Sequence, residues 1–124
     1  MHATRDQIPL LFGTDRAGIR GTDWGELRAT VASIPAGTDI TPLLKGLPNN
    51  RCPCSHRGYV LTGEMRMTFA DGEETVPAGD LFYLPPGHTV AVQHDVEYVE
   101  FSPSGVYDDF LAAAQRNIAT IKAP

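Results

Sequence analysis

The chain has 124 residues, of which 42% are hydrophobic and 20% charged, a composition typical of one globular domain with a single core. Its 15 acidic and 10 basic residues give a formal charge of −5, and lysine and arginine form no run. Proteins that bind nucleic acid or a membrane surface need a basic patch, so the charge argues against both kinds of partner.

The sequence shows no segment for membrane insertion or export. No apolar stretch approaches the roughly 20 residues of a membrane-spanning helix, and residues 1–9 lack the continuous apolar core of a signal peptide. We therefore expect a cytoplasmic protein, whose thiols stay reduced. Its two cysteines, Cys52 and Cys54, are then metal ligands or bystanders rather than a disulfide.

In chain order, three regions are expected. Residues 1–22 are mixed and glycine-rich, which predicts a loosely packed N-terminal arm. Over residues 23–103, short apolar runs alternate with turn signals at regular spacing, a pattern typical of an antiparallel sandwich or barrel. We expect strands at about residues 25–34, 38–44, 56–62, 64–70, 73–77, 81–84, 88–93 and 96–102.

Residues 104–124 are expected to form a C-terminal helix. Its apolar residues recur at helical spacing, and they are Tyr107, Phe110, Leu111, Ala114, Ile118 and Ile121. We expect this stripe to pack on the outside of the barrel or across a dimer interface.

The sulfur and imidazole groups cluster in the segment Cys52-Pro53-Cys54-Ser55-His56, and His88 follows in a second turn. Thiolate and imidazole are the side chains that hold transition metals. The alternative is that both cysteines are small buried hydrophobes and that His56 is a hydrogen-bonded core histidine.

Residues 58–87 carry a pattern of turn residues that resembles the cupin family. Gly63 matches the closing glycine of the first cupin motif, and Gly79, Pro85 and Gly87 match the frame of the second. The resemblance implies an all-β fold, a cupin-type jelly-roll β-barrel followed by the C-terminal α-helix. It also implies an open barrel mouth that holds a metal or a ligand.

The ligand residues depart from the family pattern. His56 stands where cupins have a glutamate, and Cys52 stands at the second histidine of the His-x-His motif. His88 lies two residues before the usual histidine position, which is Val90 here. The chain resembles a bacterial subgroup of cupins that is built around a Cys-x-Cys-x-His segment and has no assigned activity.

Spacing leaves two arrangements of the ligands. In a straight strand, residues 52 and 56 would lie ~13 Å apart, too far for one ion. A bend at Pro53 would bring Cys52 and His56 to one ion with His88, and we prefer this arrangement. Alternatively, Cys54 and His56 form a neighbouring pair, so Cys54 is kept as a reserve ligand.

Sulfur with imidazole favours Zn²⁺ and is compatible with Fe²⁺, and three protein ligands leave one coordination position for water or substrate. Three further residues are candidates for a substrate pocket. Arg66 would bind a carboxylate, Glu100 would be a buried acid near the metal, and Tyr59 would line the mouth. For each of the three, an ordinary structural role is the alternative.

We therefore expect a metal-dependent enzyme that acts on a small metabolite, or a non-catalytic module that binds or senses a small molecule or the metal. A metal-free barrel kept for assembly is the third alternative. The expected partners are a small-molecule ligand and a second copy of the chain, because Tyr83 and Leu84 are apolar on opposite faces of one strand. Substrate and reaction do not follow from the sequence.

Overall fold

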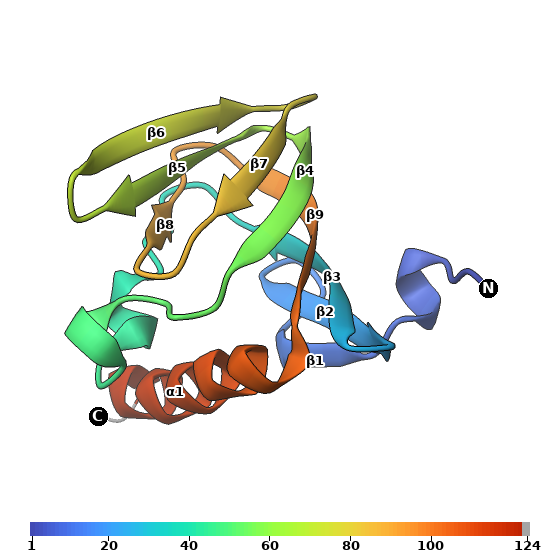
Figure 1. The fold of residues 1–124 in the computed structure, drawn as a ribbon, viewed down its shortest axis with the longest axis horizontal. Coiled ribbons are helices and arrows are strands. Elements are labelled where there is room, and N and C mark those ends of the chain that lie inside the picture. The colour runs from blue at the N-terminus through green and yellow to red at the C-terminus, as the bar shows by residue number, and fades with distance from the viewer. Residues whose placement is uncertain (123–124) are drawn as a thin grey trace.

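The computed structural model describes residues 1–122 and the side chains up to Thr120 (Figure 1). Strands within these residues form two antiparallel sheets, ordered β1-β2-β3-β9-β4-β7 and β6-β5-β8. The strands are β1 (Leu10–Gly13), β2 (Gly18–Trp24), β3 (Leu27–Ile34), β4 (His56–Thr62), β5 (Glu64–Phe69), β6 (Gly72–Pro77), β7 (Leu81–Leu84), β8 (Thr89–Ala91) and β9 (Val96–Pro103). Short 3-10 helices are η1 (Arg5–Gln7), η2 (Thr41–Leu44) and η3 (Pro48–Asn50), and one long helix, α1 (Ser104–Lys122), ends the described chain.

The two sheets face each other around one apolar core. Met65 and Met67 alternate with outward residues on β5 and are almost completely buried. They pack against Val60, Tyr98 and other inward residues of the larger sheet. Strand pairing does not run from one sheet into the other, so the described strands form a sandwich of two sheets and not a closed barrel.

Most of the expected strands are confirmed to within about two residues, but residues 38–44 are not a strand. Asp39 makes one isolated bridge to Ala91, and η2 follows at once. Pro42 lacks the N–H that a strand ladder needs, and the Asp39 carboxylate accepts a hydrogen bond from the backbone N–H of Thr41 at 2.9 Å. These two features favour a turn of helix over an extended strand.

The expectation of a loosely packed arm over residues 1–22 is wrong for its second half. Residues 10–13 and 18–24 form β1 and β2, and β2 pairs with β3 in unbroken register from Gly18 to Trp24. Gly21 is one reason why this segment pairs closely, since a Cβ there would lie 2.5 Å from Leu11. The glycines that suggested a loose segment instead allow close packing.

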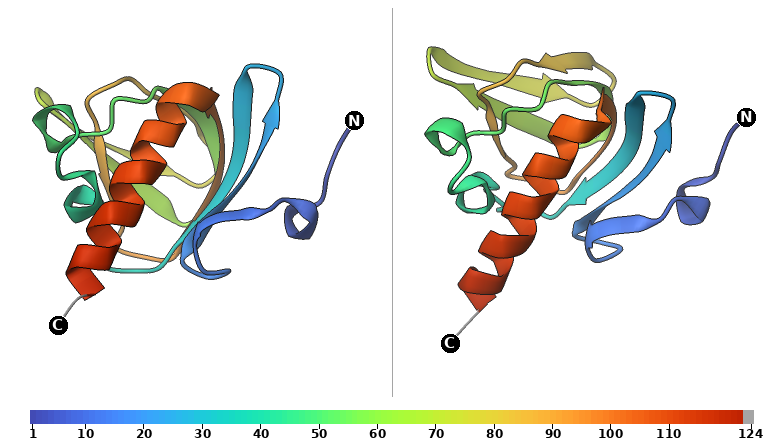
Figure 2. Two further views of the ribbon diagram at one scale, coloured as in Figure 1. Left: turned by 90° about the horizontal axis from the view of Figure 1, so that it is seen from below. Right: turned by 60° about the horizontal axis from the view of Figure 1, so that its bottom comes forward.

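Helix α1 crosses one end of the sandwich, as both views of Figure 2 show. Its buried face, which includes Tyr107, Phe110 and Ala114, packs against Leu44, Cys52 and Cys54. The helix thus covers the end between the sheets, whereas it was expected on the outside of the barrel or across a dimer interface. Ile121, the last residue of the expected stripe, has its side chain outside the described part of the chain, as do residues 123–124.

Two polar contacts tie α1 to the rest of the fold. Near its start, Arg28 of β3 donates hydrogen bonds to Asp108 at 2.6 Å and to Asp23 at 2.8 Å. Near its end, the Asn117 amide donates to the backbone carbonyls of Leu43 and Lys45. In the part of the chain described, no helix is both long and apolar enough to span a membrane.

Candidate metal centre

The backbone holds Cys52 beside His88, although the two residues are far apart in the chain. The Cys52 N–H donates to the His88 carbonyl at 2.9 Å, and the Gly87 N–H donates to the Cys52 carbonyl at 2.8 Å. Gly87 has φ = +94°, a conformation that residues with a side chain rarely adopt. The Pro-Pro-Gly turn that resembles the cupin motif therefore places His88 against the cysteine segment.

His56 joins them from the first position of β4, where it pairs with Leu84 of β7. Its Nε2 atom lies 3.7 Å from the Cys52 sulfur. One ligand atom from each of Cys52, His56 and His88 lies within 4.8 Å of the other two. Of the two arrangements left open by the sequence, the structure has the one in which the chain bends after Cys52.

Hydrogen bonds orient both imidazole rings. His88 Nδ1 lies 2.8 Å from the Pro85 carbonyl, which can only accept, so Nδ1 carries the proton and Nε2 keeps its lone pair. His56 Nδ1 lies 2.6 Å from the Ser102 hydroxyl, which leaves Nε2 on the side of Cys52. A metal-bound histidine normally donates its other N–H in this way.

Burial sets the protonation of the cluster, whose three residues are at most 5% exposed. Burial, and secondarily the neighbouring His88, lowers the pKa of His56 to about 3, and burial also lowers the pKa of His88. Both rings are therefore neutral at pH 7 and offer lone pairs. Burial raises the pKa of Cys52 to about 12, so its thiol ionises near neutral pH only if a cation is present.

Glu100 brings a carboxyl group with an unsatisfied oxygen next to the cluster. One oxygen, Oε1, lies 3.5 Å from His56 Nδ1, and the other, Oε2, is buried without a hydrogen-bond partner among the described residues. Burial raises the pKa of Glu100 to about 8. A buried carboxyl without a partner costs free energy unless a cation or another donor compensates it, so the site fits a positive ion.

Cys54 lies outside the cluster. Its thiol points to the backbone carbonyls of Ser55 and Pro103, at 3.6 and 3.9 Å, and the side chain is completely buried under α1. Of the two cysteines, Cys52 is therefore the candidate metal ligand. Cys54 is positioned like a small buried hydrophobic residue.

The three expected pocket residues separate in the structure. Glu100 lies at the cluster, on the inward face of β9. Arg66 is half-buried on β5 between the inward Met65 and Met67, so it lies on the opposite face of that strand. Tyr59 is 38% exposed on the outer face of β4. Arg66 and Tyr59 therefore do not line the cluster, because strand alternation turns them away from it.

A cavity of about 30 Å³ lies at the cluster and is lined by all three candidate ligands, Glu100 and the aromatic residues Tyr98, Tyr107 and Phe110. Such a volume holds one water molecule or one ion. Tyr107 and Phe110 come from α1, so the helix closes the cavity. From the sequence, Tyr107 and Phe110 were expected only to pack, because helical spacing was the only signal that they carried. Ser102 was not predicted at all.

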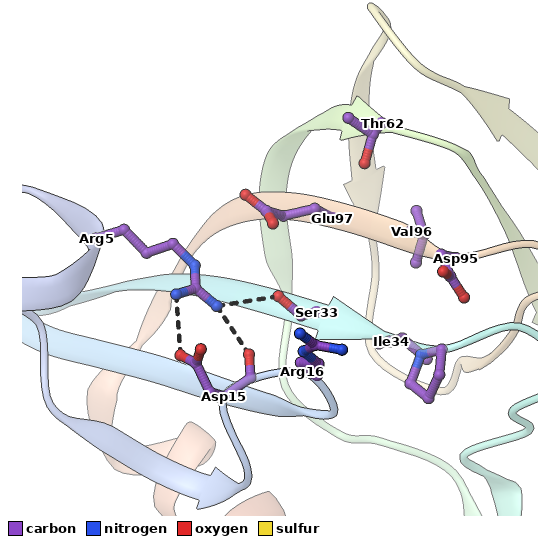
Figure 3. Close-up of a pocket in the computed structure, with 10 residues that line it drawn as sticks. Arg5, Asp15, Arg16, Ser33, Ile34, Thr62, Asp95, Val96 and Glu97 are labelled. Carbon is purple, nitrogen blue, oxygen red and sulfur yellow. Dashed lines mark hydrogen bonds and ion pairs between the residues drawn. The ribbon is translucent and has the colours of Figure 1, made fainter.

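A wider hollow of about 600 Å³ lies between η1, the end of β3 and the start of β9, and it shares no lining residue with the cavity at the cluster (Figure 3). Two of its charged residues form an ion pair: the Arg5 guanidinium donates to the Asp15 carboxylate at 3.1 Å, and it also donates to the Asp15 carbonyl at 2.9 Å and to Ser33 at 3.4 Å. Within the part of the chain that the structure describes, no group of three candidate metal ligands lies at this hollow. Among the described residues, the chemistry is concentrated at the buried cluster.

No family model matches the chain, and no curated protein matches it. Solved structures do match. An RmlC-like cupin from Shewanella frigidimarina is 16% identical, with a TM-score of 0.59 over 82% of this chain and 87% of that one. The Cnp3 cupin domain of Schizosaccharomyces pombe is 14% identical, with a TM-score of 0.57 over 82% and 72% of the two chains.

A putative ethanolamine utilization protein Q from Salmonella typhimurium is also similar, at 13% identity and a TM-score of 0.54 over 69% of this chain and 68% of that one. At such low sequence identity, the similarity to these solved structures shows the fold alone. The chain has the cupin fold, as its glycine and proline pattern predicted.

Proposed function

We propose that this chain is a metal-binding cupin in which Cys52, His56 and His88 hold one divalent transition-metal ion. The observation that carries the proposal is the approach of their three ligand atoms to within 4.8 Å of one another in a buried site. The neutral imidazoles and the unpartnered Glu100 oxygen support it, because both fit a cation. The two sheets then correspond to the halves of a jelly-roll barrel.

Zn²⁺ is the favoured ion and Fe²⁺ is the alternative. One sulfur and two imidazole ligands suit zinc, and iron in a reduced compartment accepts the same donors. When bound, such an ion supplies Lewis-acid chemistry at a position that the protein leaves open. The chain's own residues orient the rings through Ser102 and Pro85 and exclude bulk water with α1.

The leading function is that of an enzyme acting on a small metabolite, with three protein ligands and one open coordination position. A second candidate is non-catalytic metal or ligand sensing, and the cavity favours it, because about 30 Å³ leaves no room for a metabolite beside the ion. Buried free thiols at Cys52 and Cys54 support a cytoplasmic site of action.

The proposed partner is a second copy of the chain, bound through the outer face of the larger sheet. Seven apolar side chains on this outer face are 38% to 81% exposed: Trp24, Leu27, Tyr59, Leu61, Leu81, Tyr83 and Phe101. Large side chains of roughly 200 Å² at these exposures amount to about 700 Å². This is more than a typical monomer leaves exposed in one patch, and it approaches the ~800 Å² that each partner buries in a stable complex.

Metal content tests the central proposal. Elemental analysis of protein purified without chelator, or reloaded with Zn²⁺, is expected to find about one ion per chain. Cys52→Ser should lose it while keeping its far-UV circular dichroism spectrum, and the matched control Cys54→Ser should keep it. A reloaded wild type without metal, or equal loss in both variants, would contradict the proposal.

Cobalt-loaded protein separates the two candidate functions. If a coordination position is open, added azide will change the visible absorption bands of the cobalt ion, which supports catalysis. If the shell is closed, the bands will not change, which supports sensing.

A further inference from the structure

A second cavity adjoins the metal site. It has a volume of about 200 Å³ and lies inside the fold between β2, the end of β3, η2 and α1. Its apolar wall includes Phe12, Ile34, Leu43 and Ile118, which are only half-buried, so solvent reaches this part of the molecule.

The wall of this cavity carries no charged side chain. Its polar side chains are the hydroxyl groups of Ser33, Thr38 and Tyr98, and the rest of the lining is aliphatic or aromatic. A charged metabolite would lose its hydration there without finding a partner, which is costly. An uncharged, mainly apolar molecule would gain from the same burial.

The cavity shares four of its side chains with the metal site. Ile19, Ile40, Tyr98 and Phe110 line both this space and the small cavity at the cluster. Both isoleucines are partly buried and pack against the main core as well as the core under α1. A molecule in the larger cavity is therefore separated from the cluster only by a wall one side chain thick.

The size also fits a small ligand. An apolar protein cavity of about 150 Å³ is large enough to bind benzene, and the present cavity, which opens to solvent, offers about 200 Å³. A benzene ring with one or two substituents, or a short branched chain, would fill it.

We propose that this apolar cavity is the ligand pocket of the protein and that it takes a small, uncharged, mainly apolar molecule beside the metal ion, in contact with the four side chains that line both cavities. The presence of the metal ion rests on the proposed function, whereas the apolar pocket is inferred independently of it. The inference replaces the sequence-based expectation of a carboxylate-binding arginine, because Arg66 lies outside both cavities.

The pocket is tested first in chelator-treated protein with toluene and benzoate, which share the ring and differ in charge. Toluene is expected to shift the methyl NMR signals of Ile34, Ile40 and Ile118 saturably, and benzoate is expected to leave them unchanged. Ile118→Trp fills the cavity and should weaken toluene binding about tenfold or more, which is about 1.4 kcal/mol.

The matched control is Ala119→Trp, on the exposed side of the same helix, which should bind toluene like the wild type. Ile34→Phe fills the pocket from β3 and provides a second test if Ile118→Trp does not fold. The inference is overturned if toluene shifts none of these signals, or if neither filling variant weakens its binding.

The relation of the pocket to the metal site is tested by repeating the toluene titration in zinc-loaded protein. Toluene is expected to bind there as it does in the chelator-treated protein, because the shared side chains separate it from the ion. Loss of toluene binding on zinc loading would overturn this arrangement. Metal analysis of the same samples distinguishes the two proposals. Toluene binding by a protein with no metal affinity would contradict only the proposed function. Metal binding without toluene binding would contradict only the proposed pocket.

Discussion

The orientation of each imidazole depends on one partner outside the cluster. For His88 the partner is the Pro85 carbonyl, which comes from the same turn. For His56 it is the Ser102 hydroxyl, which comes from β9, nearly fifty residues further along the chain. His88 is therefore positioned by local structure, whereas His56 depends on the register between distant strands.

Replacing Ser102 with alanine tests this dependence. His56 Nδ1 then loses its hydrogen-bond partner at 2.6 Å, and we expect metal affinity to fall about 10- to 100-fold, as is usual for such partners. Competition with a coloured chelator measures the change. Ser55→Ala is the control, because the Ser55 hydroxyl makes no hydrogen bond among the described residues, and an equal loss in both variants would contradict the role of Ser102.

The sequence was sufficient to predict Cys52, His56 and His88 as a group, because sulfur and imidazole are rare and lie next to recognisable turns. It was not sufficient to choose between Cys52 and Cys54 without a geometric argument. Ser102 was out of reach, since serine is common and its position beside His56 follows only from strand register. Of the two roles left open for Arg66, the structure has the ordinary structural one, because the inward face of β5 is formed by its methionines.

At the scale of elements, the start of α1 is fixed by a small ionic group. Asp23 Oδ1 accepts hydrogen bonds from Arg28 Nε at 2.8 Å and from the Ser104 hydroxyl at 3.0 Å. Arg28 also holds Asp108 on the helix. The hydrogen bond from Arg28 lowers the pKa of Asp23 below its usual 3.8.

This shift predicts a pH-dependent effect of Asp23→Asn. A carboxyl whose pKa is lowered by folding stabilises the protein above its unfolded pKa, and this contribution is lost as the pH falls through the folded pKa. The variant should be less stable than the wild type at pH 6, by about 1 kcal/mol or less because Asp23 is half exposed. The gap should shrink below about pH 4.

Urea unfolding at several pH values measures this gap. Asp71→Asn, at the exposed turn between β5 and β6, is the control and should show no such gap. A gap that stays constant down to pH 2 would show that Asp23 does not act through its charge.

Elements with clean periodicity were predictable from sequence, and those that depend on pairing were not. The alternation on β5 and the helical stripe of α1 are local patterns, and both elements are present as expected. β1 and β2 contain charged residues and glycines, so their strand character comes from pairing with β3. The place of α1 across the end of the sandwich likewise depends on tertiary contacts that the stripe does not encode.

At the scale of the whole molecule, the exposed apolar face of the larger sheet is the main unpartnered surface. Leu81, at 81% exposure, lies on the edge strand β7, and beside it Arg57 stacks over the Tyr83 ring at 4.9 Å. Twofold pairing would place this patch against itself.

Leu81→Arg should therefore raise the dimer dissociation constant tenfold or more, because it places a charge in an apolar interface. Sedimentation velocity over a range of concentrations measures the change, and metal content should stay unchanged. Thr75→Arg adds the same charge to the exposed face of β6 in the other sheet and should have no effect. A wild type that stays monomeric at high concentration would rule this interface out.

Helix α1 follows every residue of the cluster in the chain and supplies two of the aromatic rings that enclose it. An ion that enters before the helix docks would be trapped behind Tyr107 and Phe110. Its exchange with free metal would then proceed only as fast as the helix lifts, so a site of moderate affinity would still retain its ion for a long time. Loosening the ionic anchor at Asp23 should shorten that residence time without altering a single ligand.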